Sequence, residues 1–218
     1  AVREERVAAG TCADCGFGSV HRAWLWPHSR IGDSFGGGCQ GTVLSSMIRT
    51  VEETTSTNED MLVLAESGEP EGLWLRADTQ IGGRGRMGRT WQSPIGNLYA
   101  STLVRVRPGD PAPATLALVA AVAVHEILCA YVADRFSVSI KWPNDLVSDG
   151  AKLAGILLER SKDAIVIGIG VNLGFHPVGL DRPVTSLAAL GLDAPDPHYF
   201  CEDLARAFDR WLAEWRTR

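Results

Sequence analysis

The sequence has no excess of positive charge, no cysteine framework and no long uninterrupted apolar run. Its 218 residues carry 21 basic and 26 acidic side chains, so the formal net charge is -5. The overall field of such a chain repels nucleic-acid phosphates. We therefore predict no DNA partner, and any anion must be bound locally. The five cysteines are odd in number and irregularly spaced, which favours free thiols in a reducing compartment over a disulfide scaffold.

The longest apolar stretch runs from Thr115 to Val124 and is interrupted by His125 and Glu126. It is shorter than the roughly 20 residues needed to cross a bilayer, so we predict no transmembrane helix and no membrane partner. The N-terminus also lacks a charged start followed by an apolar core and a small-residue cleavage site. These absences favour a cytoplasmic location.

Residues 1–46 differ in composition and periodicity from the rest of the chain. They are rich in Gly, Cys and Ser and show neither helical nor strand periodicity. We interpret them as a poorly structured arm, and a natural start at Met47 is an alternative that would place them upstream of the protein proper. A zinc site is a further alternative, but the spacing matches no standard finger, so we name no metal ligand. The residues that would form it are Cys12, Cys15, His21, His28 and Cys39.

From Met47 onward the pattern becomes regular, and the 45% hydrophobic content is enough to build a core. Ser56 occupies a helix N-cap position, and Glu59 completes a predicted capping box with it. Asp149-Gly150 between two apolar runs indicates a hairpin. Hairpins outnumber crossovers, which predicts the α+β class. The predicted strands span 48–53, 73–78, 97–106, 136–142, 146–148, 152–160 and 164–173, and the predicted helices span 56–68, 114–134 and 197–218.

The strongest chemical signal is the loop Gly83-Arg84-Gly85-Arg86-Met87-Gly88-Arg89-Thr90-Trp91. Its glycines let a ligand approach the backbone, and its arginines supply forked donors for carboxylate or phosphate. We interpret it as an anion clamp, with a solvated basic loop as the alternative. The glycine spacing also fits G-x-G-x-x-G, but a dinucleotide-binding fold needs a helix to begin there. The residues after Trp91 predict a strand instead.

Two further segments place polar residues among apolar ones. Lys141-Trp142-Pro143-Asn144-Asp145 joins two predicted strands and puts Asn144 and Asp145 at the tip of a turn, although a simple turn is the alternative reading. Lys152 is one cation on an apolar strand, where an exposed lysine at a strand start is the alternative. Gly155 weakens that strand unless something approaches its backbone, and a ligand is one such thing.

Taken together, Ser56-Thr57-Asn58, GRGRMGRTW, KWPNDL, KLAGIL and GIGVNL follow one another in an order that resembles the biotin protein ligase family. The resemblance covers about Val51 to Leu173. It implies a mixed, largely antiparallel sheet backed by helices, related to the class II aminoacyl-tRNA synthetase catalytic domain, and a catalytic domain over residues 47–218. Many relatives begin with a winged-helix DNA-binding domain and most bacterial members end in a small β-barrel, and we expect neither here.

The resemblance implies ATP-dependent ligation of biotin to a lysine of the biotin carboxyl carrier protein, a subunit of acetyl-CoA carboxylase, through biotinyl-5'-AMP. ATP and biotin are then the substrates, and Mg²⁺ is expected with ATP. Two other functions stay open, namely lipoate or octanoate transfer on the same fold and a catalytically weakened fragment that binds biotin or a nucleotide. A homodimer also stays open, because relatives often dimerise through sheet edges.

The resemblance also assigns roles to single residues. Arg84 and Lys152 are the implied catalytic residues, at the biotin carboxylate and the reacting phosphate. Met87 stands where several relatives carry another arginine, so one phosphate or loop-ordering contact is missing. The implied biotin-binding residues are Ser56, Thr57, Asn58, Gln80, Gly83, Arg84, Gly85, Arg86, Lys152 and Gly155. The implied nucleotide-binding residues are Arg86, Arg89, Trp91, Asn144, Asp145 and Asn172.

Overall fold

A computed structural model describes residues 3–6, 46–132 and 135–217 of the chain. The residues proposed above for a zinc site, and most of the predicted N-terminal arm, lie outside the described residues. Of that arm, Arg3–Arg6 forms strand β1, which the sequence did not predict because its four residues are all charged. Pairing with a neighbouring strand, rather than an apolar pattern, therefore accounts for this element.

Eight strands of the described chain form one sheet in the order β1-β2-β3-β4-β8-β7-β6-β5. Neighbours are antiparallel except for β2 and β3, which run parallel. This confirms the predicted mixed, largely antiparallel sheet. The strands after β1 are β2 Met47–Thr54, β3 Leu73–Gln80, β4 Leu98–Arg105, β5 Val138–Lys141, β6 Asp145–Ser148, β7 Ala151–Ser161 and β8 Ala164–Val171.

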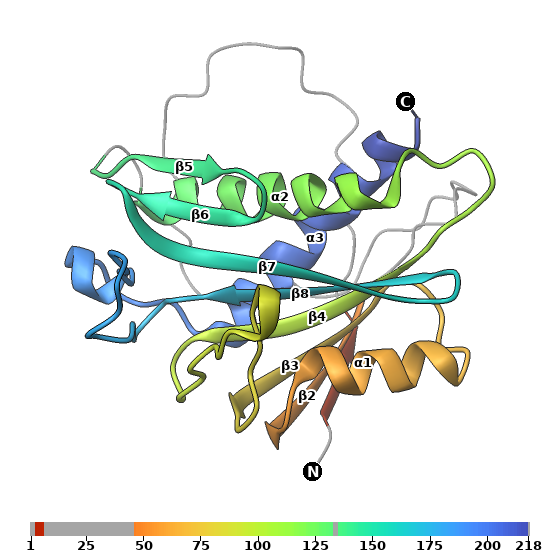
Figure 1. Cartoon of the computed structure of the whole chain (residues 1–218), viewed down its shortest axis with the longest axis horizontal. Coiled ribbons are helices and arrows are strands. Elements are labelled where there is room, and N and C mark those ends of the chain that lie inside the picture. The colour runs from red at the N-terminus through yellow and green to blue at the C-terminus, as the bar shows by residue number, and fades with distance from the viewer. Residues whose placement is uncertain (1–2, 7–45, 133–134, 218) are drawn as a thin grey trace, which may run out of the picture.

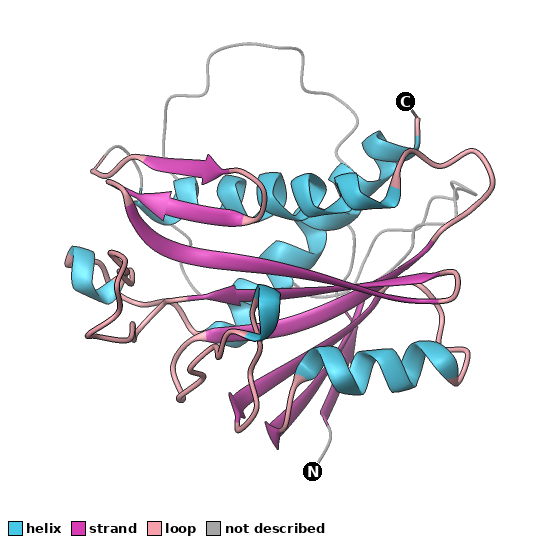
Figure 2. Ribbon diagram, in the orientation of Figure 1, coloured by secondary structure: helices cyan, strands magenta, loops and turns pink. Residues whose placement is uncertain are grey.

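Three helices cover the two faces of the sheet (Figures 1 and 2). Helix α1 spans Thr57–Glu66 and packs on one face, while α2, Leu116–Val132, and α3, Pro197–Arg216, pack together on the other. Two buried clusters result, a large one between the sheet and the α2–α3 pair and a smaller one under α1. The fold therefore has the α+β class and the helical backing that the sequence predicted.

Side chains of β8 alternate between these two clusters, as the two-residue period of a strand requires. Ile165, Ile167 and Ile169 belong to the large cluster, whereas Val166 belongs to the cluster under α1. Both faces of β8 are thus buried, which explains why its sequence is a continuous apolar run.

Two predicted helix details are corrected by the structure. Ser56 is the N-cap of α1, but its side chain makes no capping hydrogen bond, so the predicted capping box with Glu59 is wrong. The backbone N–H of Thr57 donates instead to Oε1 of Gln80, and Glu59 pairs with Arg84. The predicted helix over 114–134 begins with a 3-10 turn, Pro113–Thr115, before α2 proper.

The predicted hairpin at Asp149-Gly150 is confirmed. Both residues have positive φ, 48° and 83°, and Ser148 pairs with Ala151 across the turn. Strand β5 is shorter than the predicted strand over 136–142, because it is an edge strand that pairs with β6 alone among the described strands.

Residues Pro113–Val132 form a helix that is long and apolar enough to cross a membrane by length and composition alone. In the fold this segment packs against the sheet and α3, and Leu116, Ala120, Val124 and Leu128 are fully buried. Its apolar character is therefore accounted for by the core.

Helix α3 is amphipathic, as its sequence period predicted. Phe208 is 2% exposed and meets the Trp74 ring edge-on at 5.6 Å, while Tyr199 on the same helix is 63% exposed. Burial of one helix face thus holds α3 on the sheet.

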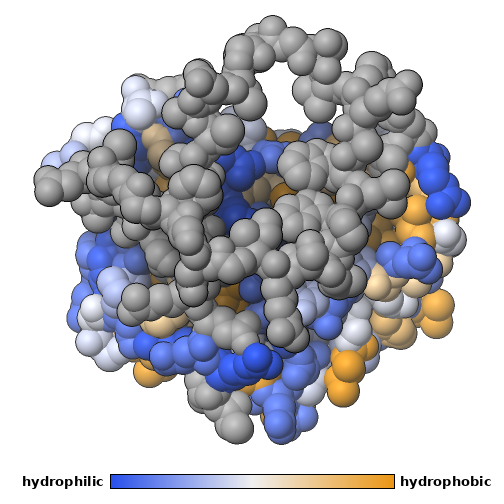
Figure 3. Space-filling model, turned by 180° about the vertical axis from the view of Figure 1, so that it is seen from behind, coloured by the Kyte–Doolittle hydropathy of each residue, from blue (hydrophilic) through white to orange (hydrophobic). Residues whose placement is uncertain are grey.

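On the side of the molecule that Figure 3 shows, hydrophobic residues gather toward one edge and hydrophilic residues cover most of the remaining coloured surface.

Replacing Phe208 by Ala should lower the free energy of unfolding by about 3–5 kcal/mol, because it leaves a cavity between α3 and Trp74. Urea denaturation followed by circular dichroism measures the change. Tyr199→Ala is the matched control on the same helix and should change stability by less than about 0.5 kcal/mol. Equal losses in both variants would mean that α3 is not held by this contact.

Candidate active site

A cavity of about 190 Å³ opens on the face of the sheet that α1 covers, next to the N-terminal end of that helix. Three glycines make the space, Gly155 on β7 and Gly168 and Gly170 on β8. A Cβ atom at Gly168 would lie 2.2 Å from Oδ1 of Asn58, and one at Gly170 would lie 2.7 Å from the indole of Trp91. The strands can approach these side chains so closely only because no side chain projects from the glycines.

The first group of polar side chains in the cavity comes from α1 and β3. Oε1 of Gln80 accepts hydrogen bonds from the backbone N–H of Thr57 at 2.8 Å and from its hydroxyl at 3.2 Å. Nε2 of Gln80 donates to Oγ of Ser93 at 2.9 Å. Ser56 also lines the cavity, and its buried hydroxyl has no hydrogen-bond partner among the residues that the structure describes. That hydroxyl is free to bind a ligand.

The second polar group is centred on the Asn58 amide, which is 4% exposed. Its Oδ1 lies 2.6 Å from Oγ of Ser101, and its Nδ2 donates to Oε2 of Glu159 at 2.7 Å. Ser101 Oγ also lies 2.8 Å from Oγ1 of Thr57. These bonds fix the amide orientation, so the wall of the cavity near α1 is rigid.

The glycine-arginine loop folds over the cavity without forming a helix. The backbone N–H of Trp91 donates to the carbonyl of Gly83 at 2.9 Å, and that of Gly85 donates to Arg89 at 2.7 Å. A single 3-10 turn, η1 Arg86–Gly88, stands at its tip, with Met87 at φ 59°. Since no helix begins here, the exclusion of a dinucleotide-binding turn is confirmed.

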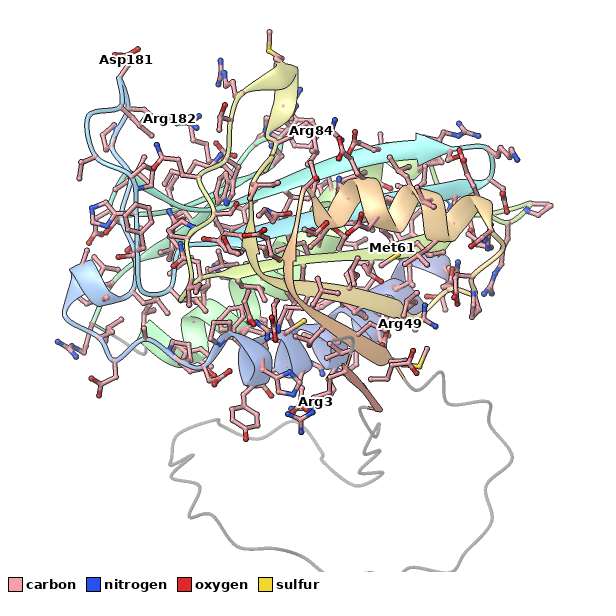
Figure 4. The ribbon with its side chains drawn as sticks, turned by 90° about the horizontal axis from the view of Figure 1, so that it is seen from below. Arg3, Arg49, Met61, Arg84, Asp181 and Arg182 are labelled. Atoms are coloured by element: carbon pink, nitrogen blue, oxygen red, sulfur yellow. The ribbon has the colours of Figure 1, made fainter. Side chains whose placement is uncertain are left out.

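Arg84 lies at the entrance to the cavity, above the start of α1 (Figure 4). Its Nη1 is 2.7 Å from Oε1 of Glu59, and its Nη2 is 3.8 Å from Oε1 of Glu159. The side chain is 39% exposed. Arg84 is thus a partly solvated guanidinium held by carboxylates at the rim, rather than a freely mobile surface charge.

Lys152 is buried, with 9% of its surface exposed, so the alternative of an exposed lysine at a strand start is wrong. Its Nζ donates to Oδ1 of Asp145 at 2.5 Å and lies 5.3 Å from the centroid of the Trp91 ring. Burial lowers the pKa of the Lys152 ammonium below its ordinary value, and Asp145 opposes this shift. Because Gly155 has no side chain, this buried cation can bind an anionic ligand in the cavity.

Asn144 and Arg86 form a connection between the loop and β7. Nη1 of Arg86 donates to Oδ1 of Asn144 at 3.1 Å, and Nδ2 of Asn144 donates to the carbonyl of Ile156 at 2.8 Å. The Pro143 turn therefore positions an arginine, which the alternative of a simple turn does not provide.

A second cavity of about 550 Å³ adjoins the first. Arg89, Thr90, Trp91, Lys152 and Arg182 line both cavities, so these five residues mark the boundary. Asn172 lines the second cavity alone, and its Nδ2 donates to the carbonyl of Thr185 at 3.0 Å. The amide of Asn172 therefore holds the segment around Thr185 in place.

The residues assigned from the sequence meet in these two cavities. Fifteen residues are assigned, and Gly83 and Asn172 are the two that do not line the first cavity. Gly83 lies behind Trp91, where a Cβ atom would come 2.4 Å from the Trp91 carbonyl. The thirteen that line it are Ser56, Thr57, Asn58, Gln80, Arg84, Gly85, Arg86, Arg89, Trp91, Asn144, Asp145, Lys152 and Gly155.

Sequence reasoning missed several residues of the site. Tyr99, Gly168 and Gly170 line the cavity from the sheet, and the two glycines in an otherwise apolar strand are a signal that could have found them. Glu59 and Glu159 give no such signal, because their role depends on where Arg84 lies in the fold. Arg182 was missed because its segment has no periodic pattern.

Residues 48–175 match the Biotin/lipoate A/B protein ligase family. Two similar curated proteins are the Biotin--[acetyl-CoA-carboxylase] ligases of Paracoccus denitrificans, 40% identical, and Mycobacterium tuberculosis, 37% identical. The matches cover 75% and 77% of this chain, and they span 72% and 64% of those proteins. The chain therefore belongs to the biotin/lipoate A/B protein ligase family.

The fold agrees with this membership. The crystal structure of the biotin protein ligase from Aquifex aeolicus in complex with biotin and ATP is similar, with a TM-score of 0.69 and 30% identity. The match covers 78% of this chain and 72% of that one. The sheet and helices described above are thus the fold of biotin protein ligases.

Replacing Asp145 by Asn should lower the pKa of Lys152 further, because the carboxylate that favours the charged ammonium is removed while burial remains. The chain contains three lysines, Lys141, Lys152 and Lys162, so a pH titration by NMR of carbon-labelled lysine resolves them. The exposed Lys162, in the turn between β7 and β8, is the internal control, and its titration curve should be the same in both proteins. A pKa of Lys152 that rises or stays constant would show that Asp145 does not stabilise its charge.

Proposed function

We propose that this protein activates biotin with ATP and transfers it to a lysine of a biotin carboxyl carrier protein. The observation that carries the proposal is that Arg84, Arg86 and Lys152 line one cavity together with neutral amide and hydroxyl groups from α1 and β3. Biotin has a carboxylate at one end and a neutral ureido ring at the other. A cavity that offers both cations and fixed neutral polar groups matches both ends.

The first step joins two anions. An oxygen of the biotin carboxylate attacks the α-phosphorus of ATP, the bond from that phosphorus to the bridging oxygen breaks, and pyrophosphate leaves. Arg84 and Lys152 are the proposed catalytic residues. Cations fixed in a partly dry cavity stabilise the negative charge on the oxygens around the α-phosphorus. Arg86, oriented by Asn144, grips the nucleotide phosphates from the loop.

The ureido ring lies against the polar groups that α1 and β3 contribute to the cavity. Ser56 offers a free hydroxyl, and Thr57, Asn58 and Gln80 offer groups whose orientation is fixed by their bonds to one another and to the sheet. Gly155 and the loop glycine Gly85 leave room for the ligand near the backbone, and Gly83 lets the loop backbone pack behind Trp91. Fixed dipoles bind a neutral polar ring without a large ordering cost.

The nucleotide lies next to the residues that line both cavities. Trp91 offers an indole face that lines both cavities, Arg89 offers a guanidinium with no partner among the described residues, and Asn172 holds the wall of the larger cavity. Asp145 acts through Lys152, whose charge it supports. In the second step the neutral carrier lysine attacks the acyl carbon of biotinyl-5'-AMP, the bond to AMP breaks, and the amine proton is released.

Mg²⁺ is expected to arrive with ATP. Among the described residues, no three His, Cys, Asp or Glu side chains converge on a metal position, and Asp145 is engaged by Lys152. The described side chains therefore do not build a site for this ion, and no step is derived through it. Mg²⁺ commonly keeps several waters and uses substrate phosphates as ligands.

Residues 47–218 make up the proposed catalytic domain. The carrier is a subunit of acetyl-CoA carboxylase in this proposal, because the similar curated proteins are ligases named for that carboxylase. A cytoplasmic location fits a reaction that uses ATP and a free thiol-containing chain. The absence of DNA binding stays a prediction from the net charge, and a homodimer through the edge of the sheet stays an open expectation.

Replacing Arg84 by Ala should reduce biotin-dependent pyrophosphate release by about 10- to 100-fold, since a charge-assisted hydrogen bond contributes about 1.5–3 kcal/mol. The assay uses labelled ATP with and without biotin. Arg160→Ala removes an exposed arginine at the β7–β8 hairpin, away from both cavities, and is the matched control. Turnover by Arg84→Ala at the level of the control would mean that this loop is not the active site.

The same preparation separates the open functions. With apo-carrier protein, biotin should be attached and lipoate should not. Labelling by lipoate alone would instead establish the lipoate or octanoate transferase function. Biotin binding without pyrophosphate release by the unaltered protein would identify a binding fragment.

A further inference from the structure

Arg182 lies at the boundary between the two cavities and has no role in the assignments above. It lines both of them, together with Arg89, Thr90, Trp91 and Lys152. Figure 4 shows its segment rising from the sheet beside the loop that carries Arg84. An arginine from a separate part of the chain is therefore brought to the point where the two cavities meet.

The backbone around Arg182 is fixed to the strand that carries Lys152. The N–H of Lys152 donates to the carbonyl of Pro183 at 2.9 Å, and the N–H of Thr185 donates to the carbonyl of Lys152 at 2.9 Å. Val184 and Lys152 form a parallel bridge. Because Pro183 follows Arg182, the Arg182 backbone is restricted to extended conformations. The arginine is thus held one residue from a rigid attachment to the active-site strand.

The charges at the boundary are not balanced. Lys152 is paired with Asp145, whereas the guanidinium groups of Arg89 and Arg182 have no hydrogen-bond or ion-pair partner among the residues that the structure describes. Asp181 is the one carboxylate among the described residues that line the second cavity, and it points outward at the tip of its segment (Figure 4). Both arginines repel the Lys152 ammonium and add to the lowering of its pKa by burial. Two exposed guanidinium groups next to a buried ammonium attract an anion with several charges more strongly than one with a single charge.

The direction of the proposed reaction indicates which anion this is. In phosphoryl chemistry of this kind the attacking and leaving oxygens lie roughly in line across the phosphorus. If the biotin carboxylate attacks from the first cavity, the pyrophosphate leaves on the opposite side, toward the second. The second cavity is the larger one, and Arg89 and Arg182 line it where it adjoins the first.

We propose that Arg182, with Arg89 opposite it, binds the β- and γ-phosphates of ATP and the pyrophosphate that leaves. This inference rests on the proposed function and names a further substrate-binding residue for it. Two guanidinium groups can each offer two donors to a polyphosphate. The biotin carboxylate has one charge and is already bound from the first cavity, so Arg182 distinguishes the leaving group from the acid.

The test compares the unaltered protein with Arg182→Gln and Arg182→Lys. Biotin-dependent ATP–pyrophosphate exchange gives the KM values for ATP, pyrophosphate and biotin, and calorimetry gives the Kd of pyrophosphate and of biotinyl-5'-AMP. Arg182→Gln should raise the KM for ATP and the Kd of pyrophosphate by about 10-fold or more. The KM for biotin and the Kd of biotinyl-5'-AMP, which lacks the β- and γ-phosphates, should change less than about twofold. Lysine should restore part of the loss, as a point charge without the fork.

Arg160→Gln is the matched control, because it removes one exposed guanidinium outside both cavities and should leave every constant unchanged. Equal weakening of pyrophosphate and biotinyl-5'-AMP by Arg182→Gln would overturn the inference, since the residue would then act on the fold or on the AMP part. Unchanged pyrophosphate binding would overturn it as well. If the unaltered protein shows no biotin-dependent exchange, the proposed function fails, while the calorimetry still tests Arg182.

Discussion

The site depends on the change from bulky side chains to glycine along one face of β7 and β8. Where α1 covers this face, Val166 and its neighbours fill the space under the helix. Two residues further along β8, Gly168 leaves the space into which the Asn58 amide projects, and Gly170 does the same for the Trp91 indole. A single Cβ atom at either glycine would displace one of these side chains, and with it a wall of the cavity.

Two of the cations at this cavity, Arg84 and Lys152, are held by local carboxylates. Lys152 is stabilised by Asp145 across the β6–β7 pair, where a register shift between Leu146 and Val147 lies between the two residues. Arg84 is stabilised by Glu59, which the helix N-terminus supplies. An incoming carboxylate or phosphate therefore enters a site in which the donors are already oriented, which lowers the cost of ordering them.

Much of this fold could be read from the sequence because it is local. The hairpin at Asp149-Gly150 is determined by two residues with positive φ, and α3 by the spacing of its aromatic side chains. The capping box failed for the opposite reason. Ser56 and Glu59 have the required spacing, but Gln80, more than 20 residues away, takes the backbone N–H of Thr57, and Arg84 takes the Glu59 carboxylate. Local patterns do not include such competition.

The same distinction holds for the site. The loop arginines and Lys152 were found because their motifs are contiguous, and the fold does bring them to one cavity. Glu159 and Arg182 stand alone in the sequence, and their place depends on pairing between distant strands and segments. Arg182 in particular reaches the boundary only through the hydrogen bonds of Pro183 and Thr185 with Lys152.

Lys152 therefore links the two cavities physically. Its backbone anchors the segment that carries Arg182 on the side of the second cavity, while its ammonium lies against Trp91 and Asp145 in the first. Any displacement of Lys152 moves both the ammonium that binds the anion and the backbone attachment of the segment that carries Arg182. A reaction that must align an acid with a phosphorus and release a second anion on the far side needs such a shared element, because alignment across a phosphorus is lost when its two sides move independently.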